Sequence, residues 1–187
     1  MTTTPTTIKL TYEDYVCFPD DGKRHELING EHYVTPTPFT QHQRISGNLS
    51  AAIHHHSQQT KQGRVFAAPT DVVFTETDVV QPDLLYIAKE QEHLITRENI
   101  QGAPDLIVEI LSNSTRRRDE RLKRNLYEQH GVKEYWIVDP ELDSVKLYRL
   151  HDGRYATPQE LSTEQPHATL STSLLPTFAL SLSDLFA

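Results

Sequence analysis

A single acidic residue inside the most hydrophobic stretch of the chain constrains the fold more than any other feature. Residues 106–111 read Leu-Ile-Val-Glu-Ile-Leu, and Glu109 is their one charged side chain. A short run that is apolar on both faces is typical of a central β-strand covered by helices on both sides. Burying a carboxylate there costs on the order of several kcal/mol unless a cation accompanies it. We therefore expect Glu109 to contact either a metal ion or, as the simpler alternative, an arginine or lysine.

Hydrophobic patterns elsewhere predict further strands and helices around that segment. Residues 45–56 and 122–127 carry apolar side chains at helical spacing, the first set after a capping box of Thr40 and Gln43. Asn29-Gly30 is typical of a type I′ hairpin turn. Runs rich in β-branched and aromatic residues predict strands at residues 26–28, 31–34, 65–68, 72–75, 79–87, 134–139 and 145–150. Together they predict an α/β fold of three layers, a central mixed β-sheet flanked by helices.

The length of the chain suits one domain. A chain of 187 residues encloses one sizeable core and is short for two. We expect one domain over residues 1–187, with a flexible Thr/Pro segment at residues 1–8 and an extension along the edge of the domain at residues 151–187. Cys17 is the one cysteine, which excludes an internal disulfide framework and a cysteine-based zinc site.

Hydropathy and charge limit where the protein acts and what it binds. No run of about 18 apolar residues is present to span a bilayer, and residues 1–7 lack the layout of a signal peptide, so we expect no membrane contact and a cytoplasmic location. The net charge of −8 argues against a protein that coats nucleic acid. Any DNA contact must be local, and residues 116–124 qualify, with six cationic side chains against two acids. The alternative is a solvated helix face.

Two further acids follow a proline at the start of strand-like segments, and geometry separates their roles. They are Asp83, in Gln-Pro-Asp-Leu-Leu, and Asp105, in Pro-Asp-Leu. Asp105 and Glu109 share a face of one strand but lie about 13 Å apart, too far for one ion. A residue on an adjacent strand is only about 4.8 Å away. We therefore predict that Asp83 lies beside Glu109 and that Asp105 caps the start of its strand.

Lys123 lies on the helix expected after the Glu109 strand. If that helix folds back across the sheet, it carries Lys123 about 12 Å along its axis, and the long side chain then reaches back toward Glu109. Lys123 also follows Asp119 by four residues. The alternative is therefore an ordinary surface ion pair between the two.

These motifs occur together with others in one order along most of residues 10–150. The stretches are residues 26–31, His42, residues 80–84, 102–112, 119–127 and 131–139. In this combination the chain resembles the PD-(D/E)XK nuclease superfamily, and more specifically a widespread bacterial family of restriction endonucleases.

The resemblance implies a restriction-endonuclease-like fold and hydrolysis of DNA phosphodiester bonds. It implies Asp83 and Glu109 as ligands of Mg²⁺, for which Mn²⁺ would substitute, and Lys123 as the residue that assists attack on the phosphate. It also implies Glu26 as the first acid of the site, where the alternative is a surface carboxylate on a strand. Since two strand cleavages need two centres, the resemblance further implies a homodimer.

One position departs from the superfamily pattern and leaves other functions open. The superfamily places a lysine two residues after the glutamate, where this chain has Leu111, and the resemblance assigns that role to Lys123. The missing lysine and the negative net charge favour an alternative, a nuclease-fold binding or regulatory module that turns over no substrate. A third alternative is a structural domain in which Glu109 pairs with an arginine.

The histidines are weaker evidence for a metal site than their number suggests. His42 lies in the first turn of the helix that we expect to begin at Thr40. We expect it to cap that helix, and the alternative is a contact with the site. Residues 54–56 are three consecutive histidines, but successive helical positions point in different directions and cannot all face one ion. We therefore expect that run to lie on the surface.

Overall fold

A mixed β-sheet forms the centre of the computed structural model, which describes residues 8–187; the N-terminal segment expected to be flexible lies outside them except for Ile8. Its strands follow the order β11-β10-β9-β8-β6-β3, with β12 paired to β10. Strands β8 and β9 are parallel and their neighbours antiparallel. The strands are β3 (Gly63–Ala67), β6 (Leu84–Ala88), β8 (Leu106–Ile110), β9 (Glu134–Asp139), β10 (Ser144–His151), β11 (Arg154–Tyr155) and β12 (Gln159–Ser162).

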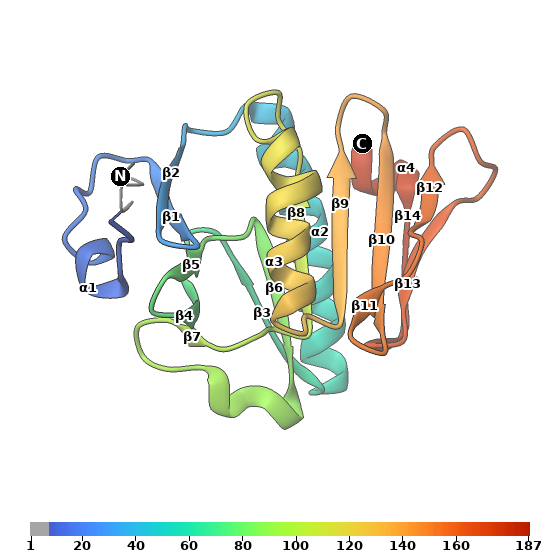
Figure 1. Cartoon of the computed structure of the whole chain (residues 1–187). Helices are drawn as coiled ribbons and strands as arrows, with labels where there is room; N and C mark the ends of the chain where they lie inside the picture. Colours follow the sequence, from blue (N-terminus) through green and yellow to red (C-terminus); the bar gives the residue numbers. More distant parts are fainter. Residues whose placement is uncertain (1–7) are drawn as a thin grey trace.

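Helices cover both faces of this sheet, as Figure 1 shows, with the helical segment α3 in front and α2 behind. On α2 (Thr40–Thr60), three side chains pack on the face that carries the even-numbered residues of β8. The π-helical segment η2 (Arg118–Lys123) continues into α3 (Arg124–Gln129), and this helix packs on the face of Ile107. The three side chains of α2 that pack on the even-numbered face of β8 are Ile45, Leu49 and Ile53. The predicted α/β architecture, a mixed sheet between helices, is confirmed.

A second sheet stands beside the first and supplies one wall of the site described below. Its order is β2-β1-β5-β4-β7, and the short helix α1 (Tyr12–Tyr15) packs against β1. The predicted hairpin is present, with Asn29 and Gly30 at its turn in the left-handed region. The strands are β1 (Arg24–Ile28), β2 (Glu31–Thr35), β4 (Val72–Thr75), β5 (Asp78–Val80) and β7 (Ile100–Gln101).

The strand predicted over residues 79–87 is wrong in one respect: it is two strands in two different sheets. β5 ends at Val80 and β6 begins at Leu84. Pro82 stands between them, and proline has no N–H to donate to a strand ladder. The break turns the chain from one sheet into the other and leaves Asp83 at the entrance of β6.

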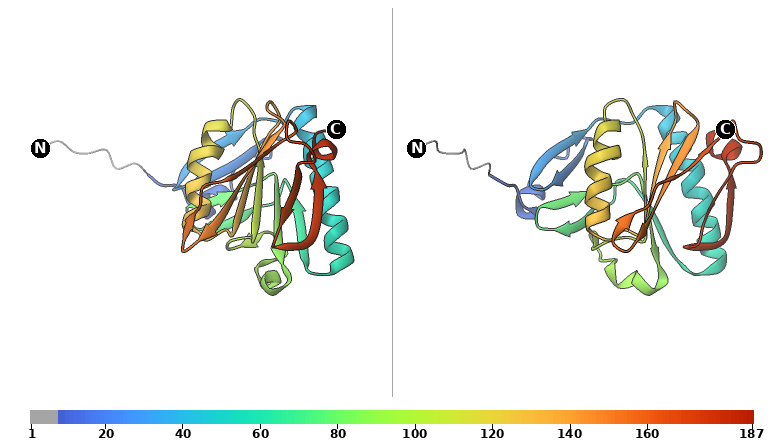
Figure 2. Two further views of the ribbon diagram at one scale, coloured as in Figure 1. Left: turned by 90° about the vertical axis from the view of Figure 1, so that its right-hand side faces the viewer. Right: turned by 45° about the vertical axis from the view of Figure 1, so that its right-hand side comes forward.

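The C-terminal region packs partly on the sheet edge and partly on α2. Strands β13 (Thr169–Thr172) and β14 (Leu175–Ser181) form a hairpin beside α2, followed by α4 (Leu182–Phe186), as Figure 2 shows. Their apolar side chains, among them Leu170 and Leu185, join the core under α2. The 3₁₀ helix η1 (Lys89–Leu94) follows β6.

One smaller expectation about a helix has a clear outcome. The capping box of Thr40 and Gln43 is wrong, because Phe39 occupies the N-cap of α2 and Thr40 is already helical. At α1, by contrast, Thr11 is the N-cap, and its backbone N–H donates to Asp14. Within residues 8–187, a helix long and apolar enough to cross a bilayer is not found.

Candidate active site

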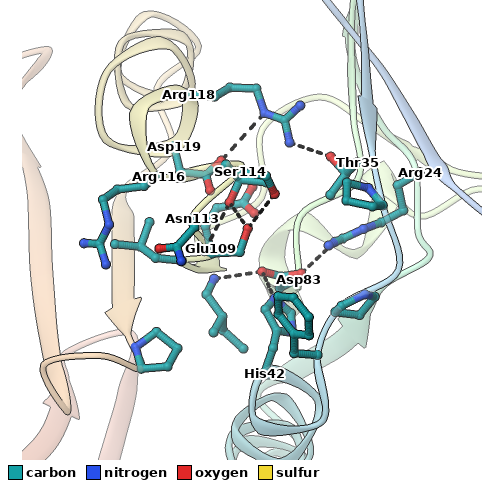
Figure 3. A pocket seen from close by; sticks show the side chains of 18 of the residues that line it. Arg24, Thr35, His42, Asp83, Glu109, Asn113, Ser114, Arg116, Arg118 and Asp119 are labelled. Carbon is teal, nitrogen blue, oxygen red and sulfur yellow. Dashed lines mark hydrogen bonds and ion pairs between the residues drawn. The ribbon is translucent and has the colours of Figure 1, made fainter.

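Asp83 and Glu109 lie next to each other on the same side of the central sheet. Leu84 pairs with Val108 in the antiparallel ladder of β6 and β8, so Asp83, one residue earlier, stands opposite Glu109. The neighbouring odd-numbered side chains of both strands pack with α3. Both acids line a pocket of about 540 Å³, shown in Figure 3. Asp83 therefore lies beside Glu109, as predicted.

Asp83 is held by three groups from three different elements. Arg24 Nη1 on β1 donates to Asp83 Oδ1 at 2.6 Å, while Oδ2 accepts from the backbone N–H of Ile110 at 2.7 Å. His42 Nε2 lies 3.1 Å from the same Oδ2. Burial alone would raise the pKa of Asp83, but the hydrogen bond with His42 and the charge of Arg24 outweigh it and lower that pKa to about 2. Asp83 is therefore ionised over the whole physiological range.

Lys123 is the cation beside Glu109, and it serves two other carboxylates as well. Its Nζ lies 2.8 Å from Glu109 Oε1, 2.7 Å from Glu26 Oε1 and 3.9 Å from Asp119 Oδ1. The Tyr127 hydroxyl also donates to Glu109 Oε1, at 2.7 Å. Lys123, Glu26 and Asp119 are all buried. The alternatives of a surface pair for Lys123 and a surface strand position for Glu26 are therefore wrong.

Asp119 and Lys123 both point inward from the π-helical turn η2. They are four residues apart, a spacing that places side chains on one side of a helix, while Arg117, just before η2, and Arg121 remain exposed. π-Helical turns are rare and occur frequently at functional sites.

One lysine cannot neutralise three buried acids, and the pKa values reflect that shortage. Burial raises the pKa of Glu109 to about 8, against the opposing effect of Lys123. Burial likewise raises the pKa of Asp119 to about 6. For Lys123, burial opposes the charge, but Glu109 and Glu26 raise its pKa above the usual value. The cluster thus holds a protonated lysine and has room for more positive charge.

Some hydrogen-bonding capacity of the cluster is unused. Glu26 Oε2 and Asp119 Oδ1 are buried without a hydrogen-bond partner among the described residues. Arg118 approaches both, at 3.5 Å from Glu26 Oε2 and 4.0 Å from Asp119 Oδ1. Buried oxygens without a hydrogen bond are uncommon in folded proteins and call for an unseen partner such as water or an ion.

The remaining polar motifs from the sequence lie outside this pocket. Asp105 caps the start of β8 as predicted, accepting from the Ala88 backbone N–H at 2.7 Å and from Lys133 at 2.6 Å. His54 and His55 are exposed, as expected, but the expectation is wrong for the third histidine of the run, which is half-buried. That residue, His56, packs edge-on against the Phe178 ring.

Sequence reasoning missed or misjudged two residues that line the pocket, His42 and Arg24, and one buried residue that contacts Glu109, Tyr127. His42 contacts Asp83 and does not cap its helix, so the expectation for it is wrong. Arg24 went unnoticed, although it precedes Glu26 by two residues on one strand and therefore shares its face. Tyr127 follows Lys123 by four residues and so lies on the same side of the helix. Once Glu26 and Lys123 are assigned to the site, these two spacings in the sequence predict that Arg24 and Tyr127 lie close to it.

Comparison with known proteins finds similarity to this chain in sequence and in fold. A family model described as "Putative restriction endonuclease" matches residues 12–183. A crystal structure from Anabaena variabilis, described as a "putative nuclease", has 21% sequence identity and a TM-score of 0.80, and the match covers 95% of this chain and 97% of that chain. The type IIG restriction endonuclease BpuSI has 13% identity and a TM-score of 0.41, covering 81% of this chain and 16% of that chain. The curated proteins contain no match.

Proposed function

The chain belongs to the Uma2 family, a family of restriction-endonuclease-like proteins, and we propose that it is an Mg²⁺-dependent endonuclease that hydrolyses DNA phosphodiester bonds. One observation carries the proposal: Asp83 and Glu109 face one pocket from adjacent strands, with Lys123 Nζ 2.8 Å from Glu109. Two acids can hold a metal ion that assists phosphodiester hydrolysis, and a lysine beside them can stabilise the charge that develops on the phosphate.

The donor chemistry of the pocket suits a hard divalent cation. Mg²⁺ prefers oxygen ligands and is commonly bound through one or two carboxylates, with waters and substrate phosphates completing its shell. Asp83 and Glu109 supply that number. Among residues 8–187 there is no group of three or more histidine, cysteine or acidic side chains arranged to hold a metal, so the proposal rests on these two carboxylates. Mn²⁺ has the same preference for oxygen and would substitute.

Bound beside these acids, Mg²⁺ would polarise a phosphate oxygen and lower the pKa of an attacking water. Lys123 then acts as a cation and not as a proton acceptor, because its neighbouring carboxylates keep it protonated. Its Nζ orients the water or stabilises charge that develops on the phosphate. Glu26 holds Lys123 in place from the second sheet, at 2.7 Å, and so positions the ammonium group.

Local positive charge supports nucleic acid as the substrate. Arg117 and Arg121 are exposed on the outer face of the helix that carries Lys123, and Arg124 is half-exposed beside them. They follow each other at helical spacing and continue to Lys146 on β10, which borders the same surface hollow as Arg121 and Arg124. We name Arg117, Arg121 and Arg124 the arginine stripe. In a chain of net charge −8, such a stripe offers a local track for phosphates.

A homodimer and a cytoplasmic location belong to the same proposal. Cleavage of both strands of a duplex requires two centres, which a symmetric dimer supplies with one site per protomer. DNA in a bacterial cell lies in the cytoplasm. Sedimentation of the protein with and without a duplex tests the dimer, and a monomer in both conditions would contradict it.

Hydrolysis of supercoiled plasmid with Mg²⁺ tests the activity. Asp83→Asn and Glu109→Gln should lower the rate by on the order of 10²- to 10³-fold, the equivalent of several kcal/mol of transition-state stabilisation. Asp105→Asn is the matched control, because Asp105 is also a buried acid after proline but lies outside the pocket. A purified protein that cuts neither DNA nor RNA with any divalent ion contradicts the proposal.

The second candidate function is the inert binding or regulatory module, which Leu111 in place of the expected lysine favours. Calorimetry separates the two, since an enzyme must bind metal and nucleic acid at one site. An inert module can bind either of them without one changing the affinity for the other, so uncoupled binding together with no hydrolysis favours the module. In the third alternative, a structural domain, Glu109 pairs with an arginine; the structure places Lys123 there at 2.8 Å, which is the lysine form of the simple ion pair expected for a buried Glu109. An Mg²⁺ titration without heat would favour this structural alternative.

A further inference from the structure

The three partners of Asp83 differ in their freedom to move. The Ile110 N–H belongs to the backbone of β8, and His42 is buried on α2. Arg24, by contrast, has a long side chain that is 18% exposed and lines the pocket. It is also held by the carbonyl oxygen of Gln81, at a longer distance of 3.3 Å. Arg24 is therefore the one of these three groups that can leave Asp83 without a change in the backbone.

While Arg24 stays, Asp83 is poorly available to a second cation. Its Oδ1 takes the guanidinium at 2.6 Å, and its Oδ2 is shared by Ile110 and His42. A carboxylate offers four lone-pair positions in all, and a divalent ion would have to approach Oδ1 against a positive charge already in contact with it. Removing the guanidinium frees Oδ1 but leaves a cation without its anion. The free-energy cost of moving Arg24 falls only if another anion takes the place of Asp83 beside its guanidinium.

A phosphodiester is the anion that the proposed function brings to this position. Guanidinium groups bind phosphate oxygens through two parallel hydrogen bonds, a geometry that Arg24 can offer from the lip of the pocket. We propose, on the basis of the proposed function, that Arg24 exchanges Asp83 for a substrate phosphate, so that nucleic acid and metal ion bind cooperatively to this pocket. Arg24 is then a residue that binds substrate and at the same time opens Asp83 to the metal.

Cooperativity of this kind is reciprocal and can be measured without turnover. If a duplex raises the affinity for metal by some factor, the metal raises the affinity for the duplex by the same factor. We expect a factor of about tenfold or more, within the range typical of coupled sites. The probes are Mn²⁺ alone, followed by calorimetry, and a short duplex with phosphorothioate linkages that resist hydrolysis. Each is titrated in the presence and absence of the other.

Arg24→Gln should abolish the coupling and raise the affinity for Mn²⁺ in the absence of DNA, because Asp83 is then free from the start. Arg24→Lys keeps the charge but cannot form two parallel hydrogen bonds to phosphate, so the coupling between Mn²⁺ and duplex binding should be smaller than in the wild type. This variant provides the test if Arg24→Gln fails to fold. Arg116→Gln is the matched control. Arg116 lines the same pocket but pairs with Asp139 and Glu141, and its loss should leave the coupling unchanged.

The outcomes separate this inference from the proposed function. A wild type that hydrolyses DNA but binds Mn²⁺ equally well with and without the duplex overturns the exchange and leaves the endonuclease standing. Coupling that survives in both Arg24 variants also overturns it. A wild type that shows the coupling, loses it in Arg24→Gln and yet hydrolyses no nucleic acid supports the exchange and contradicts the endonuclease.

Discussion

Lys123 Nζ lies 2.8 Å from Glu109 Oε1, although 14 residues separate the two in the sequence. The helix that follows β8 folds back over the sheet and returns the lysine to the strand that precedes it. The superfamily pattern would place its lysine two residues after the glutamate, at the position of Leu111. An ammonium group thus reaches the glutamate from a different element, and the same ion pair also fixes Glu26 from the second sheet.

Lys123→Met should destabilise the fold as well as remove hydrolysis. It would leave Glu26 and Glu109 buried without their cation, a change that costs about 3–5 kcal/mol of unfolding free energy. Urea unfolding measures it. Lys133→Met is the matched control, because Lys133 also contacts a buried acid, Asp105 at 2.6 Å, but its side chain is 55% exposed; the expected loss there is about 1 kcal/mol or less. Equal losses in both variants would contradict the buried ion-pair network.

The parts of the site that the sequence reveals are those that follow from strand and helix periodicity. Placing Asp83 beside Glu109 needed only the spacing between adjacent strands, and returning Lys123 to Glu109 needed only a helix that folds back. Both distances depend on backbone geometry that hardly varies between proteins. For the same reason the two helix-covered faces of β8 were predictable from its apolar run.

Other parts depend on tertiary packing, which local patterns do not encode. His42 contacts Asp83 only because α2 begins where β6 begins, and nothing in its neighbourhood signals this. The division of residues 79–87 between two sheets depends on the tertiary position of Pro82, between β5 in the second sheet and β6 in the central one. The proline itself was visible in the sequence and predicts a break in a strand. The π-helical turn at residues 118–123 has no clear signature in the side-chain spacing.

Tyr127→Phe should weaken the fold through a single lost hydrogen bond to Glu109. Burial raises the pKa of Glu109 to about 8, so the comparison is made above that pH, where Glu109 is ionised. Hydrogen bonds to charged groups contribute about 1.5–3 kcal/mol, and the Tyr127 hydroxyl is 2.7 Å from Glu109 Oε1. Tyr135→Phe is the comparison, because the Tyr135 hydroxyl donates to a neutral backbone oxygen, that of Asp119, at 3.1 Å. Its loss should cost about 0.5–1.5 kcal/mol. If urea unfolding ranks the two variants in the opposite order, the hydroxyl of Tyr127 does not stabilise the charged form of Glu109.

The arginine stripe should make duplex binding depend on salt. Replacing two phosphate-contacting cations lowers the slope of log Kd against log salt concentration by about two, roughly one per contact. The double variant Arg121→Gln/Arg124→Gln tests this by fluorescence anisotropy with a labelled duplex. The control pair is Lys89→Gln/Arg97→Gln, which removes the same charge from exposed positions on and after η1. A similar fall in slope for both pairs would mean that net charge, and not the stripe, governs binding.

The ion pair of Arg116 with Asp139 should contribute to stability only above mildly acidic pH. Arg116 grips both oxygens of Asp139, at 2.6 and 3.0 Å. Burial alone would raise the pKa of Asp139, but the hydrogen bonds from Arg116 and from the Glu141 backbone outweigh it, so the folded-state pKa lies below the ordinary value. Because the folded pKa is the lower one, the unfolded chain takes up a proton first as the pH falls. The stabilisation is therefore complete above the unfolded pKa of about 3.9 and is lost below it.

Asp139→Asn should consequently lower the unfolding free energy at neutral pH and flatten its fall between about pH 5 and about pH 2. Denaturant unfolding across that range measures both effects. Glu160→Gln is the control, since Glu160 is 64% exposed and only 3.9 Å from Lys146, a pair that water screens; its profile should follow the wild type. An Asp139→Asn profile parallel to that of the wild type would show that the pair with Arg116 does not set the acid limit. Asp83 would then be the next acid to test, because its folded-state pKa is also lowered, whereas burial raises the pKa of Glu109 and Asp119 and gives their titration the opposite sign.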